Sequence, residues 1–198
     1  MLDTQKEILK NQNSEYLSIG ITQSGEPYGP IAVPWEHTAS AFNMKTPNVY
    51  LTEQDLKDPE IREILNNYHI IGCYIFDALE DYSFIAEFKE LRDIFIMNGS
   101  GITDISFMKD LKEWFMFYIE EAQIPNLEPL FPTQEKRIGI FPYCIGFGGC
   151  EIKDITALEN SEIYLSELIV LCPKGTNDRE RWQNIRCGTY GYYEYELK

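Results

Sequence analysis

The sequence predicts an α/β fold in which short parallel strands stack into a solenoid, with a non-repeat cap at each end. Two repeating patterns predict it. The phrase I-x-D/N-I-x-x-L recurs with small changes, and its copies begin at Leu79, Ile102, Ile124 and Ile152. A second pattern, apolar-x-x-apolar-x-apolar, lies between the copies. Because such a short unit cannot bury its apolar side alone, neighbouring copies are expected to stack.

The N-terminal elements precede the repeats. The stretch from Tyr16 to Trp35 is rich in Gly and Pro around SGEPYGP, which indicates two extended pieces and a turn. Val49 and Leu51 indicate a first strand. A helix is predicted to begin at Asp58-Pro59, because Pro is favoured at the first helical position, and apolar residues follow at helical spacing as far as Tyr68.

The central strands are predicted from the second pattern, whose last two apolar residues alternate as they do in a strand with one buried face. In the middle of the chain each strand is expected 20 residues after the one before it. The residues predicted to face the core, strand by strand, are Ile71, Tyr74 and Phe76; Leu91, Ile94 and Ile96; Leu111, Trp114 and Met116; Ile138 and Ile140; and Leu165, Leu168 and Val170.

The C-terminal elements complete a single predicted domain. Asn177 is expected to cap a short helix that reaches about Ile185, and the stretch TYGYYEYEL predicts a final strand. The domain divides into an N-terminal cap over 1–46, irregular repeats over 47–171 and a C-terminal cap over 172–198.

The repeats resemble the leucine-rich repeat family, specifically its internalin-like bacterial type, in which I-x-D-I-x-P-L precedes each L-x-x-L-x-L strand. The match is close over 79–130 and looser over 47–78 and 131–171. The asparagine expected in the turn after the strand is missing, since Asn98 precedes that position in one repeat and Glu120–Glu121 occupy it in another. The resemblance implies a bacterial protein whose parallel sheet lines a concave face.

The charge balance limits the partners. The 198 residues carry a net charge of −15, which argues against a nucleic-acid backbone or an anionic membrane, because those partners need clustered Lys and Arg. It permits a basic protein partner. No apolar run approaches the ~18 residues that a membrane span needs. Five cysteines, an odd number, follow a polar N-terminus that is no export signal, which predicts reduced thiols and a cytoplasmic location.

Catalysis and cofactor binding are not expected from the motifs. The two histidines are His37 and His69, and His69 falls at a helix-to-strand junction. The cysteines sit in no recognisable nucleophile motif. Cys144 and Cys150 lack a second pair of zinc ligands. Cys73 and Cys172 are predicted to be small packing residues.

Two further patterns are interpreted as structural. Gly146–Gly149 (GFGG) is followed by no Lys-Ser/Thr pair, so it is predicted to be the flexible turn of an insertion and not a phosphate cradle. The acidic residues of the repeated phrase, Asp81, Asp104 and Asp154, are predicted to bond nearby backbone amides in turns and not to hold a metal.

The candidate binding site is the sheet face that the predicted register turns toward water, where an apolar and aromatic stripe runs beside an acidic one. Such patches usually mark interaction sites, so the rings of Phe95, Phe115 and Phe117 are expected to be exposed. Two alternatives are a homodimer through this face and coverage by a terminal segment. The site residues are Ile75, Asp77, Asp93, Phe95, Met97, Glu113, Phe115, Phe117, Glu167 and Ile169.

The function expected from these observations is the binding of a protein or peptide partner through the concave sheet face, with no chemistry of its own. A different hypothesis is a small acidic inhibitor, such as an immunity protein that neutralises a basic toxin, in which the acidic column would dominate. A third is an enzyme, for instance a thiol-dependent one, built on the non-repeat ends.

Overall fold

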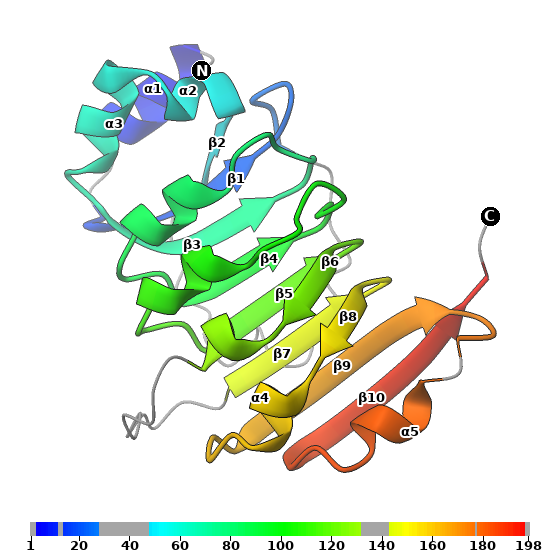
Figure 1. Ribbon diagram of the computed structural model, residues 1–198. Coiled ribbons are helices and arrows are strands. Elements are labelled where there is room, and N and C mark those ends of the chain that lie inside the picture. Colours follow the sequence, from blue (N-terminus) through cyan, green and yellow to red (C-terminus); the bar gives the residue numbers. More distant parts are fainter. Residues whose placement is uncertain (1–2, 12–13, 28–47, 132–142, 177, 197–198) are drawn as a thin grey trace.

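The chain has an α/β architecture with a parallel main sheet, seen in a computed structural model that describes residues 3–11, 14–27, 48–131, 143–176 and 178–196 (Figure 1). The eight strands of this sheet follow the order β10-β9-β7-β5-β4-β3-β1-β2. From β3 onward, successive strands of the sheet are neighbours in chain order. Figure 1 shows that short helical turns and a second, two-stranded sheet lie along one side of the main sheet.

The elements are short, and none of the helices in the described ranges is long and apolar enough to cross a membrane. The main sheet contains β1 (Tyr16–Ile21), β2 (Asn48–Leu51), β3 (His69–Ile75), β4 (Asp93–Ile96), β5 (Met116–Glu120), β7 (Tyr143–Gly148), β9 (Leu165–Pro173) and β10 (Cys187–Tyr195). The small sheet contains β6 (Gln123–Asn126) and β8 (Glu151–Asp154). The helices are α1 (Asp3–Lys10), α2 (Glu53–Leu56), α3 (Pro59–Leu65), α4 (Thr156–Glu159) and α5 (Arg179–Trp182), and the 3-10 turns are η2 (Ser83–Glu87), η3 (Ser106–Asp110) and η4 (Glu128–Leu130).

The helices before the repeats begin at well-formed caps. At the start of α3, Oδ1 of Asp58 accepts a hydrogen bond from the N–H of Glu60 at 2.8 Å, and Pro59 is the first helical residue, as predicted. At the start of α2, Thr52 and Asp55 form a capping box: each side chain accepts a hydrogen bond from the other residue's N–H. These bonds satisfy amides that a helix start leaves unpaired.

The repeated phrase forms the same turn in all four copies. Its Asp or Asn accepts a hydrogen bond from the backbone N–H two residues later, and a short helical turn follows. The oxygen-to-nitrogen distances are 2.8 Å for Asp81–Ser83, 3.0 Å for Asp104–Ser106, 3.0 Å for Asn126–Glu128 and 2.8 Å for Asp154–Thr156. The prediction that Asp81, Asp104 and Asp154 bond nearby amides in turns is therefore confirmed, and Asn126 forms the same bond although it was not predicted to.

The core lies between the main sheet and the turns. One row of buried side chains crosses the sheet in register, and it consists of Ile75, Ile96, Ile119, Phe147 and Val170. The ring of Phe147 packs against Trp182 of α5, with centroids 5.7 Å apart. The row therefore faces the layer of helical turns. We call this side of the main sheet the inner face and the opposite side the back face.

The predicted register is correct in β4 and wrong in β3 and β5. In β3, Ile75 lies on the inner face and Tyr74 on the back face, the reverse of the prediction. In β5, Phe117 lies on the inner face and Met116 on the back face. The 20-residue interval therefore does not hold. Both faces of these strands carry large apolar side chains, so hydrophobic alternation cannot select one register.

The glycine-rich stretch is not the flexible turn that was predicted. Gly146, Phe147 and Gly148 belong to β7, which is buried between β5 and β9. Gly149, just after the strand, has a φ of 60°, which side-chain-bearing residues rarely adopt. A β carbon on Gly148 would lie 2.9 Å from the hydroxyl of Tyr118, which is too close. The hydroxyl of Tyr118 therefore fits here because residue 148 is a glycine.

The two ends agree in part with the predictions. The extended piece at Tyr16 is confirmed as β1, and the predicted first strand is β2, although β1 lies between β2 and β3. The predicted final strand is confirmed as β10. Helix α5 ends at Trp182, before the predicted limit of Ile185. The residue predicted to cap it, Asn177, and the strand predicted at 138–140 lie outside the described residues.

Candidate binding site

The aromatic residues predicted to form an exposed binding face are buried. Phe95 and Ile169 lie on the back face, as predicted, but are only 4% and 3% exposed. Ile75 and Phe117 lie on the inner face and are 0% exposed. Phe115 precedes β5 and is 6% exposed. The expectation of exposed rings at Phe95, Phe115 and Phe117 is therefore wrong, and the back face is not a free aromatic surface.

Two of the predicted acidic residues lie in one row of the back face. Asp93 of β4 and Glu167 of β9 occupy this row, with Met116 and Cys144 between them. Both carboxyl residues are half-buried, and Met116 and Cys144 are buried. The row is therefore acidic at two points and apolar between them, and the aromatic row of Phe95 lies beside it.

The remaining predicted residues do not belong to this row. Glu113 precedes β5 and is exposed. Asp77 follows β3, where its Oδ2 accepts a hydrogen bond from the N–H of Gln23 at 2.8 Å. Met97 follows β4 and is half-buried against the core. The acidic residues predicted to form one column therefore lie at different positions along the strands.

Asp93 is the most strongly perturbed carboxyl group of the back face. Burial raises the pKa of Asp93 to about 6, although the charge of the neighbouring Arg92 acts in the opposite direction. Within the described ranges, its Oδ1 is buried and has no hydrogen-bond partner. A buried carboxylate oxygen without a hydrogen-bond partner destabilises the ionised form, so the protonated form is favoured.

The thiols and the described histidine show no activated chemistry. All five cysteines carry free thiols. Burial raises the pKa of Cys73, Cys144 and Cys150 to about 12, so these thiols are protonated at neutral pH and are poor nucleophiles. The exposed His69 lies beside Glu90, with 2.7 Å between Nδ1 and Oε1. His37 lies outside the described residues.

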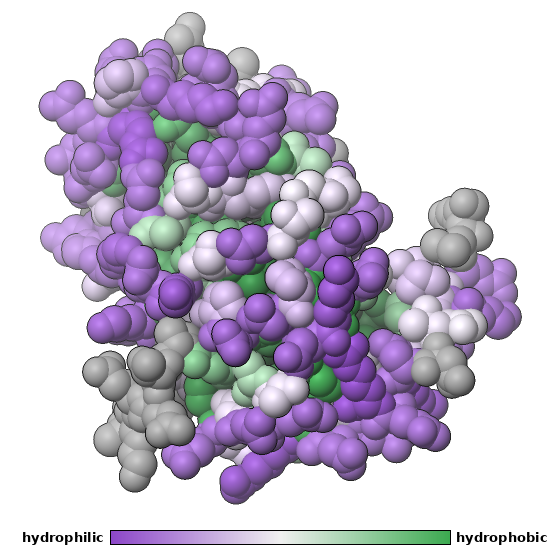
Figure 2. Space-filling model, in the orientation of Figure 1, coloured by the Kyte–Doolittle hydropathy of each residue, from purple (hydrophilic) through white to green (hydrophobic). Residues whose placement is uncertain are grey.

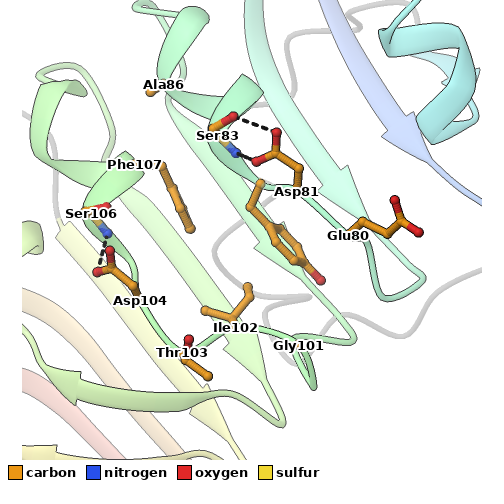
Figure 3. Close-up of a pocket in the computed structure, with 11 residues that line it drawn as sticks. Glu80, Asp81, Ser83, Ala86, Gly101, Ile102, Thr103, Asp104, Ser106 and Phe107 are labelled. Carbon is orange, nitrogen blue, oxygen red and sulfur yellow. Dashed lines mark hydrogen bonds between the residues drawn. The ribbon is translucent and has the colours of Figure 1, made fainter.

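A surface groove of about 330 Å³ lies between the first two copies of the repeated phrase (Figure 3). We call it the turn groove. It runs beside η2 and η3, so neighbouring repeats supply its two sides. The lining residues are Glu80, Asp81, Tyr82, Ser83, Ala86, Gly101, Ile102, Thr103, Asp104, Ser106 and Phe107.

The turns hold two carboxylates at the groove. In Figure 3 the carboxylate of Asp81 points toward Ser83, and that of Asp104 points toward Ser106. Asp81 accepts hydrogen bonds from both the N–H and the hydroxyl of Ser83, which lower the pKa of Asp81 and keep it ionised at neutral pH. A carboxylate has about four acceptor positions, so both groups can accept further donors. Glu80 adds a third carboxyl group at the groove.

Two aromatic rings form the apolar wall of the turn groove. Tyr82 and Phe107 stack with their centroids 6.4 Å apart and an interplanar angle of 21°. The hydroxyl of Tyr82 donates to the carbonyl of Asn98 at 3.2 Å and accepts from the N–H of Leu79 at 3.0 Å. Both rings are buried, and these bonds fix the first of them. The groove thus combines a rigid apolar wall with an acidic rim.

Sequence reasoning identified the turns but missed the groove between them. Tyr82 is the fourth residue of its copy and Phe107 is the sixth residue of the next, so the repeat itself gives no signal that these two rings stack. The depth of the groove depends on how two consecutive turns are spaced, and the residue types alone do not specify that spacing.

The comparisons with known proteins identify no relative: no family model, curated protein or solved structure matches the chain. In the described ranges, no group of three or more His, Cys, Asp or Glu residues is arranged to hold a metal ion. The site is therefore interpreted from its own geometry.

Proposed function

We propose that the chain is a short, irregular solenoid of the leucine-rich-repeat kind and that it acts by binding another protein. Each repeat would contribute one strand of the main sheet and one Asp- or Asn-closed turn on the opposite side. The four equivalent turns and the chain-order stacking of the strands from β3 to β10 support this proposal. The free thiols support a reducing, cytosolic location.

The turn groove is the surface proposed to receive the partner, because the three acidic residues at its rim, Glu80, Asp81 and Asp104, are exposed, whereas Asp93 and Glu167 of the back face are half-buried. The single observation that carries the proposal is the combination of carboxylates from Glu80, Asp81 and Asp104 with the ring wall of Tyr82 and Phe107. A Lys or Arg side chain fits this combination. Its charged end would bond to the rim while its aliphatic stem, or a guanidinium plane, packs on a ring.

The charge of the whole chain favours the same class of partner. The net charge of −15 attracts a basic protein, and Figure 2 shows hydrophilic side chains around and between the less polar ones on the face that carries the turns. An acidic inhibitor that neutralises a basic toxin is one specific form of this function. Steering by charge accelerates association at low salt, so the association rate should fall steeply with ionic strength.

Selection of peptides from a random display library on the purified protein tests the proposal. The selected peptides should be enriched in Lys and Arg. A synthetic peptide from this set should bind about tenfold more weakly or worse when Thr103→Arg places a positive charge at the groove. Thr103 is exposed and lines the groove, so the substitution should leave the fold intact.

The matched control is Gln183→Arg, which makes the same change of charge at an exposed position just after α5. It should leave the dissociation constant nearly unchanged. Selected peptides without basic residues, or an equal loss of affinity in both variants, would exclude the turn groove as the binding site.

A further inference from the structure

The C-terminal edge of the main sheet is a long strand, β10, which pairs with a neighbour on one side only within the described residues. β10 ends the strand order, and most of its nine residues are exposed (Figure 1). An edge strand presents backbone N–H and C=O groups that can pair with another chain, and proteins commonly blunt such edges with Lys or Pro. The sequence of β10, CGTYGYYEY, contains neither residue.

The register shows which backbone groups face this open edge. The N–H of Lys174 donates to the carbonyl of Tyr195 at 2.8 Å, so the backbone groups of Tyr195 point toward the β9 side. Backbone groups alternate in direction along a strand. The residues whose N–H and C=O groups point outward are therefore Gly188, Tyr190, Tyr192 and Glu194.

Exposed aromatic residues gather at the same edge. In the described ranges the large hydrophobic residues that are exposed are Tyr164, Tyr193 and Tyr195, at 54%, 58% and 40%. Tyr193 and Tyr195 belong to β10, and Tyr164 lies beside its first residues, with its hydroxyl 2.9 Å from where a β carbon on Gly188 would lie. The hydroxyl of Tyr195 lies 2.6 Å from where a β carbon on Gly149 would lie, so this ring leans across β9, and a strand added to β10 would bury part of Tyr193.

The charge distribution allows a second copy of this acidic chain to approach at this edge. Residues 173–198 contain five basic and four acidic side chains, so the acidic excess lies in the rest of the chain. Like-charge repulsion between two copies is therefore weakest here. The charges at the two ends of β10 are also self-complementary: the exposed Arg186 directly precedes the strand, and the exposed Glu194 lies near its end.

We infer that β10 pairs antiparallel with β10 of a second copy, about a two-fold axis that passes near Tyr190. This register places Gly188 opposite Tyr192 of the other copy, and all of these residues have outward backbone groups. It places Arg186 opposite Glu194 on both sides of the axis. The two main sheets then form one continuous sheet. The dimer carries two turn grooves and can engage a repetitive partner with higher avidity.

A charge exchange tests the pairing directly. The unmodified protein should sediment with twice the mass of one chain. Arg186→Glu and Glu194→Arg should each raise the dimer dissociation constant about tenfold or more, because each change sets like charges opposite each other twice in a symmetric dimer. An equimolar mixture of the two variants should restore dimers, since both contacts then join opposite charges.

Each outcome of this experiment either supports the proposed pairing or contradicts it. A monomeric unmodified protein at about 100 μM, the low-affinity end for a specific dimer, would overturn the inference. Unchanged dimers in both single variants would place any interface elsewhere, and monomers in the mixture would refute the antiparallel register. Thermal melts should show that both variants remain folded. Failure of this test leaves the turn groove unaffected, because that groove lies on η2 and η3.

Discussion

At the scale of single residues, short polar side chains determine the shape of the repeats. The third copy of the phrase has Asn126 where the others have aspartate, and its amide oxygen accepts the same backbone hydrogen bond. The turn therefore needs an acceptor oxygen at this position and not a negative charge. Any charge present at the position is available for another purpose, and in the turn groove we assign it to a basic partner.

Substitutions at Asp104 test directly whether the turn needs only an acceptor oxygen or also the negative charge. Asp104→Ala should lower the free energy of unfolding by about 1 kcal/mol, because it leaves the N–H of Ser106 without its acceptor. Asp104→Asn should change stability much less, since Asn126 already performs this role in the third copy. Urea denaturation of both variants measures the difference. Equal losses would show that the charge stabilises the turn.

The buried carboxyl group of Asp93 should make stability depend on pH. Its pKa of about 6 in the folded state lies above the ordinary value of 3.8, so the folded protein holds a proton that the unfolded chain has released between these values. Stability should therefore fall as pH rises from about 4 to about 6. Asp93→Asn should remove this dependence and stabilise the protein by on the order of 2–3 kcal/mol at pH 7.5.

Guanidinium unfolding at pH 4 and pH 7.5 measures the effect. The gain from Asp93→Asn should be small at pH 4, where the aspartic acid is neutral in the folded state. A gain of the same size at both pH values would show that packing, and not ionisation, controls this site.

At the scale of elements, the predictions succeed where chemistry is local. The cap of α3, the three aspartate turns and strands β2, β4 and β10 depend on short-range signals, and the sequence predicts all of them. Which side chains of β3 and β5 point into the core depends on tertiary packing, that is, on which side of each strand packs against the helical turns. The run Trp114–Ile119 is apolar at every position, so nothing in it distinguishes the two faces. The exposed face predicted from that register was therefore wrong.

Phe117 provides the test of the corrected register. Phe117→Ala should destabilise the protein by about 3–5 kcal/mol, because the ring is fully buried on the inner face. The exposed Glu113 provides the control, and Glu113→Ala should change the free energy of unfolding by less than about 0.5 kcal/mol. A small effect at Phe117 would restore the original register, in which this ring meets water.

At the scale of the whole molecule, charge and apolar exposure are separated along the chain. The acidic excess lies before residue 173, and the exposed tyrosines lie toward the C-terminal edge of the main sheet. We therefore assign different partners to different ends: a basic protein to the turn groove, and a second copy to β10. The sequence alone indicates the first class of partner through its net charge. It cannot show that the aromatic back face is buried, because that depends on tertiary packing.

The most direct test of the central claim is a map of backbone amide shifts by NMR while a selected basic peptide is titrated onto the labelled protein. The account predicts that the largest shifts occur at Ser83, at residues 101–104 and at Ser106, and that Thr103→Arg removes them. Shifts confined to the back-face residues of β4, β5 and β9, with no change around η2 and η3, would contradict the proposed binding site.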